Sequence, residues 1–127
     1  PKRLSGRLSH NNRRKQMTQL IEESKSDLEY NVDHIIETLE SGHYETEDEN
    51  GPNGFDYLTD ALDINYIING DKTYKGARIL VSFGGPNIWI DTFKEQVEGY
   101  WWGETIIKSY NQDNLYLDQA CEEFYNC

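Results

Sequence analysis

The stretch that decides the fold is residues 79–102, ILVSFGGPNIWIDTFKEQVEGYWW, in which apolar and polar side chains alternate along the chain. The alternation stops at Gly84-Gly85-Pro86 and again around Phe93–Glu95. A period of two predicts β-strands, and Gly- and Pro-containing breaks predict the turns between them. Because the connections are short, successive strands are expected to run antiparallel, as in a meander.

Further strand patterns flank this stretch on both sides. Ile64, Tyr66 and Ile68 alternate before the turn Asn69-Gly70-Asp71. On the other side, Thr105–Tyr110 either extends the last strand or adds a fifth one. The sequence therefore predicts four or five antiparallel strands.

Helical patterns stand before and after the predicted sheet. Apolar residues recur at helical spacing from Met17 to Leu39, which predicts one helix over about residues 11–41 or two helices that divide near Ser26. Ser26-Asp27-Leu28-Glu29 has the spacing of a capping box, and Gly42 is suited to end a helix. Phe55, Leu58 and Leu62 predict a short helix, and a last helix is expected to begin near Asp113, a good N-cap, with an apolar stripe of Leu117, Ala120, Cys121 and Phe124.

Together these patterns predict an α+β fold with an N-terminal helix, a short helix, a four- to five-stranded antiparallel meander and a C-terminal helix. We expect residues 1–15 to form a basic flexible arm and residues 16–127 to form a single acidic domain. Within that domain, 16–41 is expected to be helical, 42–54 to be an acidic loop, and 55–127 to contain the helix–sheet–helix part.

The charges are separated along the chain. The 127 residues contain 12 Lys and Arg against 23 Asp and Glu, for a net charge of −11. Six of the basic residues lie in the first 16 positions, which hold no acid, so the other six leave residues 17–127 with a net charge of −17. A body this acidic repels nucleic acid and favours basic surfaces, such as those that bind nucleic acid.

Acidic residues of the first long helix and of the following loop are the candidate partner-binding surface. In the helix they recur every three, four or seven residues and so fall along neighbouring rows on one side, roughly 6 Å apart for i,i+4 pairs. Carboxylates at that spacing can imitate the phosphates of a DNA strand, whereas the alternative is a solvated face that keeps the protein soluble. The candidate residues are Glu22, Glu29, Asp33, Glu37, Glu40, Glu45, Glu47, Asp48 and Glu49.

The basic residues of the arm are candidates for contact with phosphates, or alternatively they lie on the protein's own acidic body. They are Lys2, Arg3, Arg7, Arg13, Arg14 and Lys15. Arm and body together indicate a partner that contains both a basic protein surface and nucleic acid. In the aromatic run Tyr100-Trp101-Trp102, strand alternation predicts Trp101 on one face and the other two side chains on the opposite face.

The sequence offers few residues for catalysis or for metal binding. The loop acids resemble a calcium loop, but Asn50 stands where that loop needs Gly, and the sequence has neither His-Glu-x-x-His nor Cys-x-x-Cys. We therefore expect no catalytic residues, no metal and no cofactor, a structural His34, and Cys121 buried with Cys127 free at the end. No apolar run approaches 18 residues and no signal-peptide pattern is present, so a cytoplasmic protein without a membrane partner is expected.

The segment PKRLSGRLSHNNRRKQMTQLIEES, residues 1–24, resembles the arm-then-helix arrangement of small anti-defence proteins of Gram-positive phages and mobile elements, in particular type II-A anti-CRISPR proteins. Residues 81–102 are also similar to small phage-type proteins of no assigned activity. The first resemblance implies a non-enzymatic inhibitor in a bacterial host cell that binds Cas9–guide RNA, with the acidic face in a nucleic-acid groove and the arm on guide RNA or DNA. The alternatives are an acidic immunity or antitoxin protein that neutralises a basic nuclease toxin, a nucleic-acid-binding or RNA-cleaving protein led by its arm, and a structural or regulatory phage protein.

Overall fold

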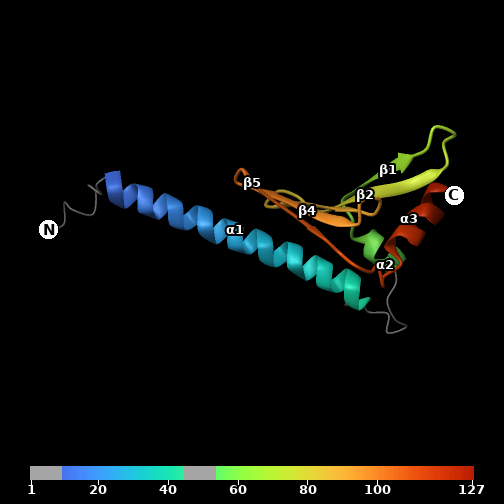
Figure 1. The fold of residues 1–127 in the computed structure, drawn as a ribbon, viewed down its shortest axis with the longest axis horizontal. Helices are drawn as coiled ribbons and strands as arrows, with labels where there is room; N and C mark the ends of the chain where they lie inside the picture. The colour runs from blue at the N-terminus through green and yellow to red at the C-terminus, as the bar shows by residue number, and fades with distance from the viewer. Residues whose placement is uncertain (1–9, 45–53) are drawn as a thin grey trace.

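The structure is a computed structural model that describes residues 10–44 and 54–127, and in these residues helices pack on one antiparallel sheet (Figure 1). The predicted α+β class and order of elements are confirmed. The elements are α1 His10–Ser41, α2 Gly54–Thr59, β1 Asp63–Ile68, β2 Tyr74–Ser82, β3 Asn87–Asp91, β4 Gln96–Trp101, β5 Glu104–Ser109 and α3 Leu117–Tyr125.

The sheet is a meander in which every strand pairs with its neighbour in sequence, in the order β1-β2-β3-β4-β5. Thr105–Tyr110 therefore adds a fifth strand, because residues 104–109 pair antiparallel with β4. The β4–β5 turn consists of Trp102 and Gly103, whose φ angles are +53° and +77°. Two successive residues at positive φ are typical of the type I′ turn that matches the twist of a two-residue hairpin.

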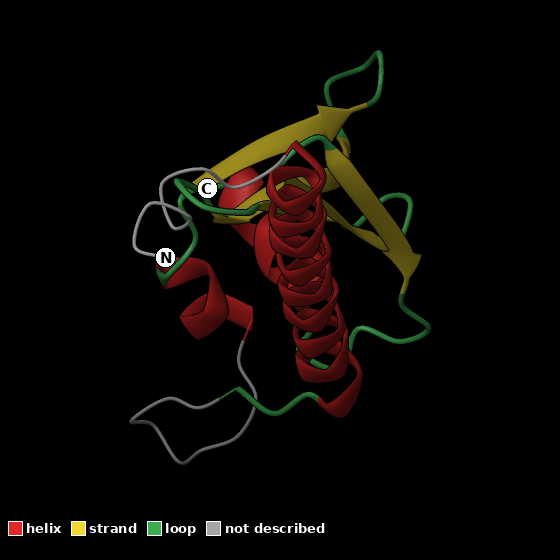
Figure 2. Cartoon of the chain, turned by 90° about the vertical axis from the view of Figure 1, so that its left-hand side faces the viewer, coloured by secondary structure: helices red, strands yellow, loops and turns green. Residues whose placement is uncertain are grey.

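One face of the sheet forms the core. The register places Ile64, Ile79, Ile90 and Val97 side by side on this face, where they join buried residues of the helices. α1 packs on β4 and β5, α3 packs on β2, and α2 packs on α3. Figure 2 shows α1 nearly end-on beside the sheet. The opposite face of the sheet has none of these helices against it.

α1 is one continuous helix of 32 residues, with no break at Ser26. Its second half is buried through Leu28, Val32 and Leu39. The helix lies so close to β4 that a Cβ on Gly99 would come within 2.8 Å of both Leu28 and Val32. As expected, Gly42 ends the helix: its φ is +69° and its N–H donates to the Thr38 carbonyl at 3.0 Å.

The first half of α1 extends past the end of the sheet (Figure 1). Every residue from 12 to 27 whose side chain the structure describes is exposed. Residues 10–15 belong to this helix, so the prediction of a flexible arm is wrong for them, and the prediction of a helix from about residue 11 is confirmed. Residues 1–9 lie outside the described residues. No helix among the described residues is both long and apolar enough to cross a membrane.

α3 begins at Leu117, later than the predicted start near Asp113. Asp113 nevertheless caps it, because its carboxylate oxygens accept the N–H groups of Leu117 and Asp118, both at 3.0 Å. Cys121 is buried in this helix and Cys127 is exposed, as expected. Burial raises the pKa of the Cys121 thiol to about 12, which keeps it protonated.

The prediction for the aromatic run is right for two of its three residues. Trp101 lies half-buried against the core, and Tyr100 lies on the opposite face, where it donates to Glu98. The placement of Trp102 on the Tyr100 face was wrong, because β4 ends at Trp101 and Trp102 turns outward in the hairpin, 68% exposed. Alternation cannot continue through a residue at positive φ.

Candidate interaction surfaces

The acidic residues predicted on α1 gather along its flank beside β5. Lys108, on β5, places its Nζ 3.0 Å from Glu29 Oε1 and 2.8 Å from Asp33 Oδ1. Hydrogen bonds from this ammonium to Asp33 and Glu29 raise the pKa of Lys108 above its ordinary value. One lysine thus stands between two carboxylates and neutralises one of their two charges.

Glu40 continues this flank at the end of α1. Its Oε2 accepts the backbone N–H of Asn111 at 2.9 Å, and its carbonyl accepts the side-chain amide of Asn114. These contacts join α1 to the chain that follows β5. We define the acidic flank as Glu29, Asp33, Glu37 and Glu40.

The acidic flank stays open to solvent although most of its members have structural partners. The side chains of Glu29 and Asp33 are 50% and 53% exposed. Glu37 is also exposed, as is Glu22, which lies farther along α1 beyond the sheet. The candidates Glu45, Glu47, Asp48 and Glu49 lie outside the described residues.

The predicted nucleic-acid-contacting residues divide into two groups. Arg13, Arg14 and Lys15 are exposed in the first turns of α1. Lys2, Arg3 and Arg7 lie outside the described residues. The three helical cations stand at the far end of α1 from the acidic flank, so the structure keeps the two charged regions apart.

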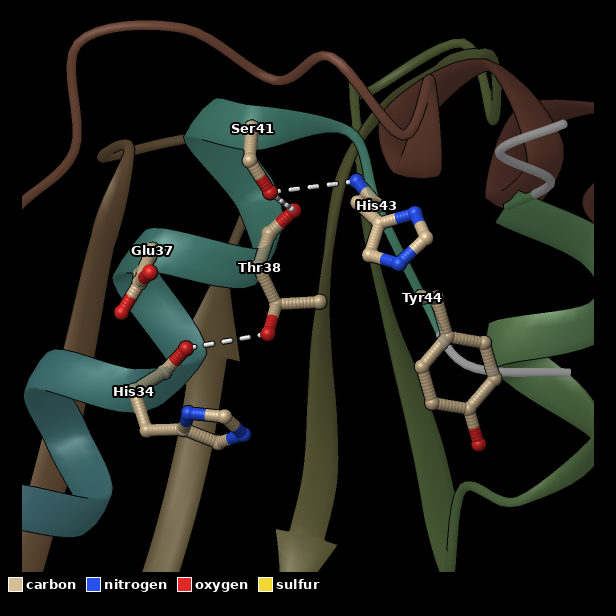
Figure 3. A pocket seen from close by; sticks show the side chains of 6 residues that line it. All are labelled: His34, Glu37, Thr38, Ser41, His43 and Tyr44. Atoms are coloured by element: carbon tan, nitrogen blue, oxygen red, sulfur yellow. Dashed lines mark hydrogen bonds between the residues drawn. The ribbon is translucent and has the colours of Figure 1, made fainter.

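A hollow of about 430 Å³ lies at the C-terminal end of α1 (Figure 3). His34 and His43 are among the residues that line it. The hydrogen bonds drawn there all involve a backbone atom: Thr38 Oγ1 donates to the His34 carbonyl, Ser41 Oγ donates to the Thr38 carbonyl, and the His43 N–H donates to Ser41 Oγ. These bonds satisfy backbone groups at the end of the helix. In the part of the chain that the structure describes, they join no serine hydroxyl to a histidine ring.

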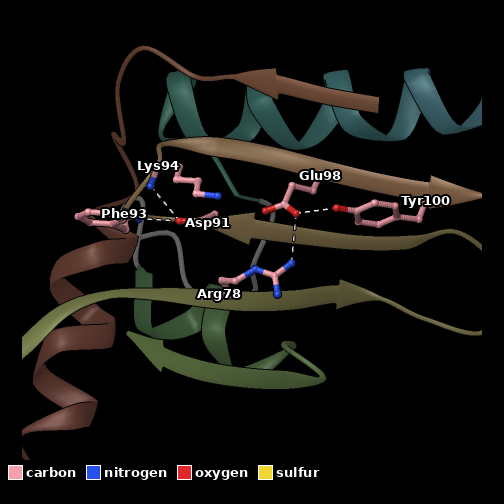
Figure 4. Close-up of polar contacts among 6 residues, drawn as sticks. All are labelled: Arg78, Asp91, Phe93, Lys94, Glu98 and Tyr100. Atoms are coloured by element: carbon pink, nitrogen blue, oxygen red, sulfur yellow. Dashed lines mark hydrogen bonds and ion pairs between the residues drawn. The ribbon is translucent and has the colours of Figure 1, made fainter. Parts of the chain in front are cut away.

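The open face of the sheet contains a polar cluster that the sequence analysis missed (Figure 4). Arg78 Nη2 lies 3.2 Å from Glu98 Oε1, which also accepts the Tyr100 hydroxyl at 2.7 Å. The Arg78 guanidinium also stacks 4.6 Å over the ring of Trp89. These four residues come from β2, β3 and β4, and the cluster shields Glu98 until only 7% of it is exposed.

The charge of Glu98 is stabilised in this setting. Burial by itself raises the pKa of the carboxyl. The hydrogen bonds from Tyr100 and Gln96 and the charge of Arg78 together lower the pKa by more than burial raises it, so the pKa ends below its ordinary value of 4.5. The sequence contains one signal for this cluster. In each predicted strand, where side chains alternate between the two faces, the positions that face away from the core include Arg78, Trp89, Glu98 and Tyr100. Recognising it requires the register between the strands, which the sequence alone does not specify.

Metal binding finds no support in the described residues, because among them no three His, Cys, Asp or Glu side chains gather closely enough to hold an ion. Comparison of the chain with protein-family models, with curated proteins and with solved structures finds no match. The functional argument therefore rests on the geometry and charge of the surfaces described above.

Proposed function

We propose that this protein is a non-enzymatic inhibitor that occupies the nucleic-acid-binding groove of a basic partner protein through its acidic flank. The observation that carries the proposal is that Glu29, Asp33 and Glu40 are held in place by Lys108 and Asn111 while two of them remain half exposed. Carboxylates fixed in this way lose less side-chain freedom on binding than free ones do.

The charge of the whole body supports the same conclusion. Among the described residues, ion pairs engage Arg78 with Glu98 and Lys108 with Glu29 and Asp33. The other carboxylates of the body therefore add to a strongly negative field. Such a field steers the protein towards a Lys- and Arg-lined groove, where it replaces the counterions or the nucleic acid that the groove binds.

The resemblance of the N-terminal segment favours a Cas9–guide RNA complex as the first partner to test. In effectors of that kind, a positively charged channel holds the guide–target duplex and a separate site reads the PAM. The acidic flank would fill one of these basic grooves. The cations at the start of the chain, at the other end of α1, would contact guide RNA or DNA.

A charge-neutralising pair of variants tests the acidic flank. Asp33→Asn/Glu37→Gln removes two charges from it and leaves Lys108 with Glu29. We expect inhibition of DNA cleavage by a reconstituted Cas9–guide RNA complex to weaken roughly 2- to 30-fold, the range for two exposed ion pairs. Glu122→Gln/Glu123→Gln, which removes two exposed charges from α3, is the matched control and should inhibit as the wild type does.

Salt provides the second arm of this experiment. Inhibition should weaken as NaCl rises from 50 to 200 mM, because the Debye length, over which exposed charges act, then falls from more than about 10 Å to below about 8 Å. Equal loss in both variant pairs would show a general field effect and contradict a specific flank. Salt-independent inhibition would contradict charge mimicry, as would a lack of inhibition across Cas9 enzymes from several Gram-positive hosts.

An immunity or antitoxin protein that neutralises a basic nuclease toxin is the second candidate, because the acidic flank lies wholly within the described body and does not need the first residues of the chain. Removal of residues 1–9 separates the two functions while leaving α1 whole. An immunity protein should bind its toxin with unchanged affinity after the deletion. The anti-CRISPR proposal expects inhibition of Cas9 to fall.

A further inference from the structure

The two edges of the sheet differ in how well they are protected. β5, at one edge, contains the charged residues Glu104 and Lys108, and Lys108 is joined to α1 by its two ion pairs. β1, at the other edge, pairs with β2 alone (Figure 1). Its sequence DINYII contains neither Lys nor Pro, the residues that commonly keep an edge strand from pairing with another chain. β1 is therefore the edge that is open to a further strand.

The backbone of β1 directs hydrogen-bonding groups out of the sheet. Ala77 of β2 lies opposite Tyr66, and it exchanges bonds with Thr92 on its other side: its N–H donates to Thr92 Oγ1 and its carbonyl accepts the Thr92 N–H, both at 2.9 Å. In an antiparallel pair, opposite residues either exchange both bonds or exchange none. Tyr66 therefore turns its N–H and C=O to the free edge, and alternation gives Ile64 and Ile68 the same direction. Among the described residues, no hydrogen bond reaches these two groups of Tyr66.

This edge is regular and has a negative charge at its start. The register with β2 shifts at Lys75, an extra residue of β2, so β1 itself has no bulge. At the start of β1, Asp63 Oδ1 accepts the N–H of Ile64 at 2.9 Å. Because that N–H points out of the sheet, the carboxylate stands at the free edge. The outward groups therefore run from the Ile64 carbonyl to Ile68, with Asp63 at one end.

Aromatic and apolar side chains line the core side of the same edge. Tyr66 is 38% exposed and Ile68 is 46% exposed. The ring of Tyr66 lies 5.2 Å from that of Tyr125, on α3, and 6.4 Å from that of Tyr74, between ring centroids. An added strand would place every second side chain beside Tyr66 and Ile68. Aromatic and β-branched residues are favourable cross-strand neighbours, so these positions suit apolar, β-branched side chains.

The charge of Asp63 indicates which kind of strand fits. A second copy of β1 would bring it no cation: in the three antiparallel registers that pair Tyr66 with an outward residue of another β1, the residue opposite Asp63 is Ile67, Asn69 or Asp71. Such pairing would also bring two strongly acidic bodies together. A strand with Lys or Arg at this position would instead form an opposite-charge cross-strand pair.

We propose that β1 binds an extended segment of a basic partner protein as a sixth, antiparallel strand. Its apolar, β-branched side chains lie opposite Ile64, Tyr66 and Ile68. Near its C-terminal end, a Lys or Arg lies opposite Asp63. Main-chain hydrogen bonds supply the affinity, and the alternate side chains supply the specificity. This edge is the one farthest in the sheet from Lys108 and the acidic flank, so the strand binds independently of that surface.

A designed peptide tests the strand addition. The probe is acetyl-Val-Thr-Val-Thr-Val-Arg-amide, whose third residue lies opposite Tyr66 in the proposed register and whose Arg lies opposite Asp63. In an NMR titration of the full chain, we expect saturable shifts of the β1 backbone amides and slower hydrogen exchange at Tyr66 and Ile68.

N-methylation of the peptide tests whether the backbone makes the contact. A methyl group on the nitrogen of the third residue removes the N–H that bonds to the Tyr66 carbonyl, and binding should weaken roughly tenfold. The fourth residue lies opposite Asn65, and its N–H points away from β1. Its N-methylated peptide is the matched control and should bind as the unmodified peptide does.

A charge swap tests the position of the cation. Asp63→Lys should weaken binding of the Arg peptide roughly 2- to 5-fold, the range for one exposed ion pair, and a peptide that ends in Glu should then bind better than the Arg peptide. Glu123→Lys, the same charge change at an exposed site of α3, should bind both peptides as the wild type does. Circular dichroism checks that both variants are folded. An affinity that Asp63→Lys leaves unchanged would contradict the proposed register.

Three further results would overturn the proposal. The first is a probe that shifts no β1 amide up to its limit of solubility. The second is an equal loss of affinity in the two N-methylated peptides, which would mean that binding does not use the backbone of β1. The third is a chain that, without peptide, sediments as a dimer in which the Tyr66 amide is protected from exchange, because a second copy would then occupy the edge.

Discussion

Glu98 is the residue on which the open face of the sheet depends. It accepts hydrogen bonds from Arg78 and Tyr100 with little exposure of its own. Replacing it with Gln keeps the shape but removes the charge that both donors face. We expect Glu98→Gln to lower the free energy of unfolding at pH 7 by about 1–2 kcal/mol, measured by urea unfolding, with exposed Glu123→Gln as the neutral control.

The pH dependence of this effect follows from the lowered pKa of Glu98. Since the folded-state pKa lies below 4.5, the charge contributes its full stabilisation above pH 4.5, and this stabilisation is lost as the pH falls through the folded-state pKa. The gap between wild type and Glu98→Gln should therefore close below pH 4.5. A gap that stays constant down to pH 3 would mean that packing rather than charge explains the variant.

At the scale of elements, Asp113 fixes the start of α3 from four residues away. Its carboxylate accepts two of the first N–H groups of the helix. We expect Asp113→Ala to cost about 0.5–2 kcal/mol, which is typical of a lost cap, and to lower Tm in a thermal melt. Gln119→Ala, at an exposed position of the same helix, is the control. If both variants have the wild-type Tm, the two hydrogen bonds contribute no net stability.

The elements themselves were largely predictable, because periodicity and breakers act locally. The alternation of Ile88 and Ile90 with the residues that follow them, the helical spacing around Leu28 and the end of the helix at Gly42 all depend on neighbours in sequence. Three features were not predictable for the opposite reason. The outward turn at Trp102 depends on two successive positive φ angles, and the joining of Lys108 to α1 and of Arg78 to Glu98 depends on contacts between residues far apart in the chain.

The same reasoning explains the candidate site. Helical spacing placed Glu29, Asp33 and Glu40 on one side of α1, and the structure agrees. Spacing within one helix does not show which neighbour that side meets. The sequence therefore could not indicate that β5 would supply Lys108 to this row.

At the scale of the whole molecule, repulsion between carboxylates opposes folding. The chain has a net charge of −11, and in the described part few carboxylates have a cation beside them. Raising NaCl from 10 to 200 mM shortens the Debye length from about 30 Å to below 8 Å, so we expect Tm to rise by about 3–6 °C. A second chloride salt at matched ionic strength controls for ion-specific effects. A fall in Tm would mean that the ion pairs outweigh the repulsion.

The position of α1 in the chain sets an order of events during synthesis. Leu28 and Val32 pack on Gly99, which the ribosome adds about 70 residues later. At 5–20 residues per second, α1 waits roughly 4–14 s for the strands that cover it. During that interval its whole apolar side is uncovered in the nascent chain, and a chaperone can bind it before the sheet closes over it.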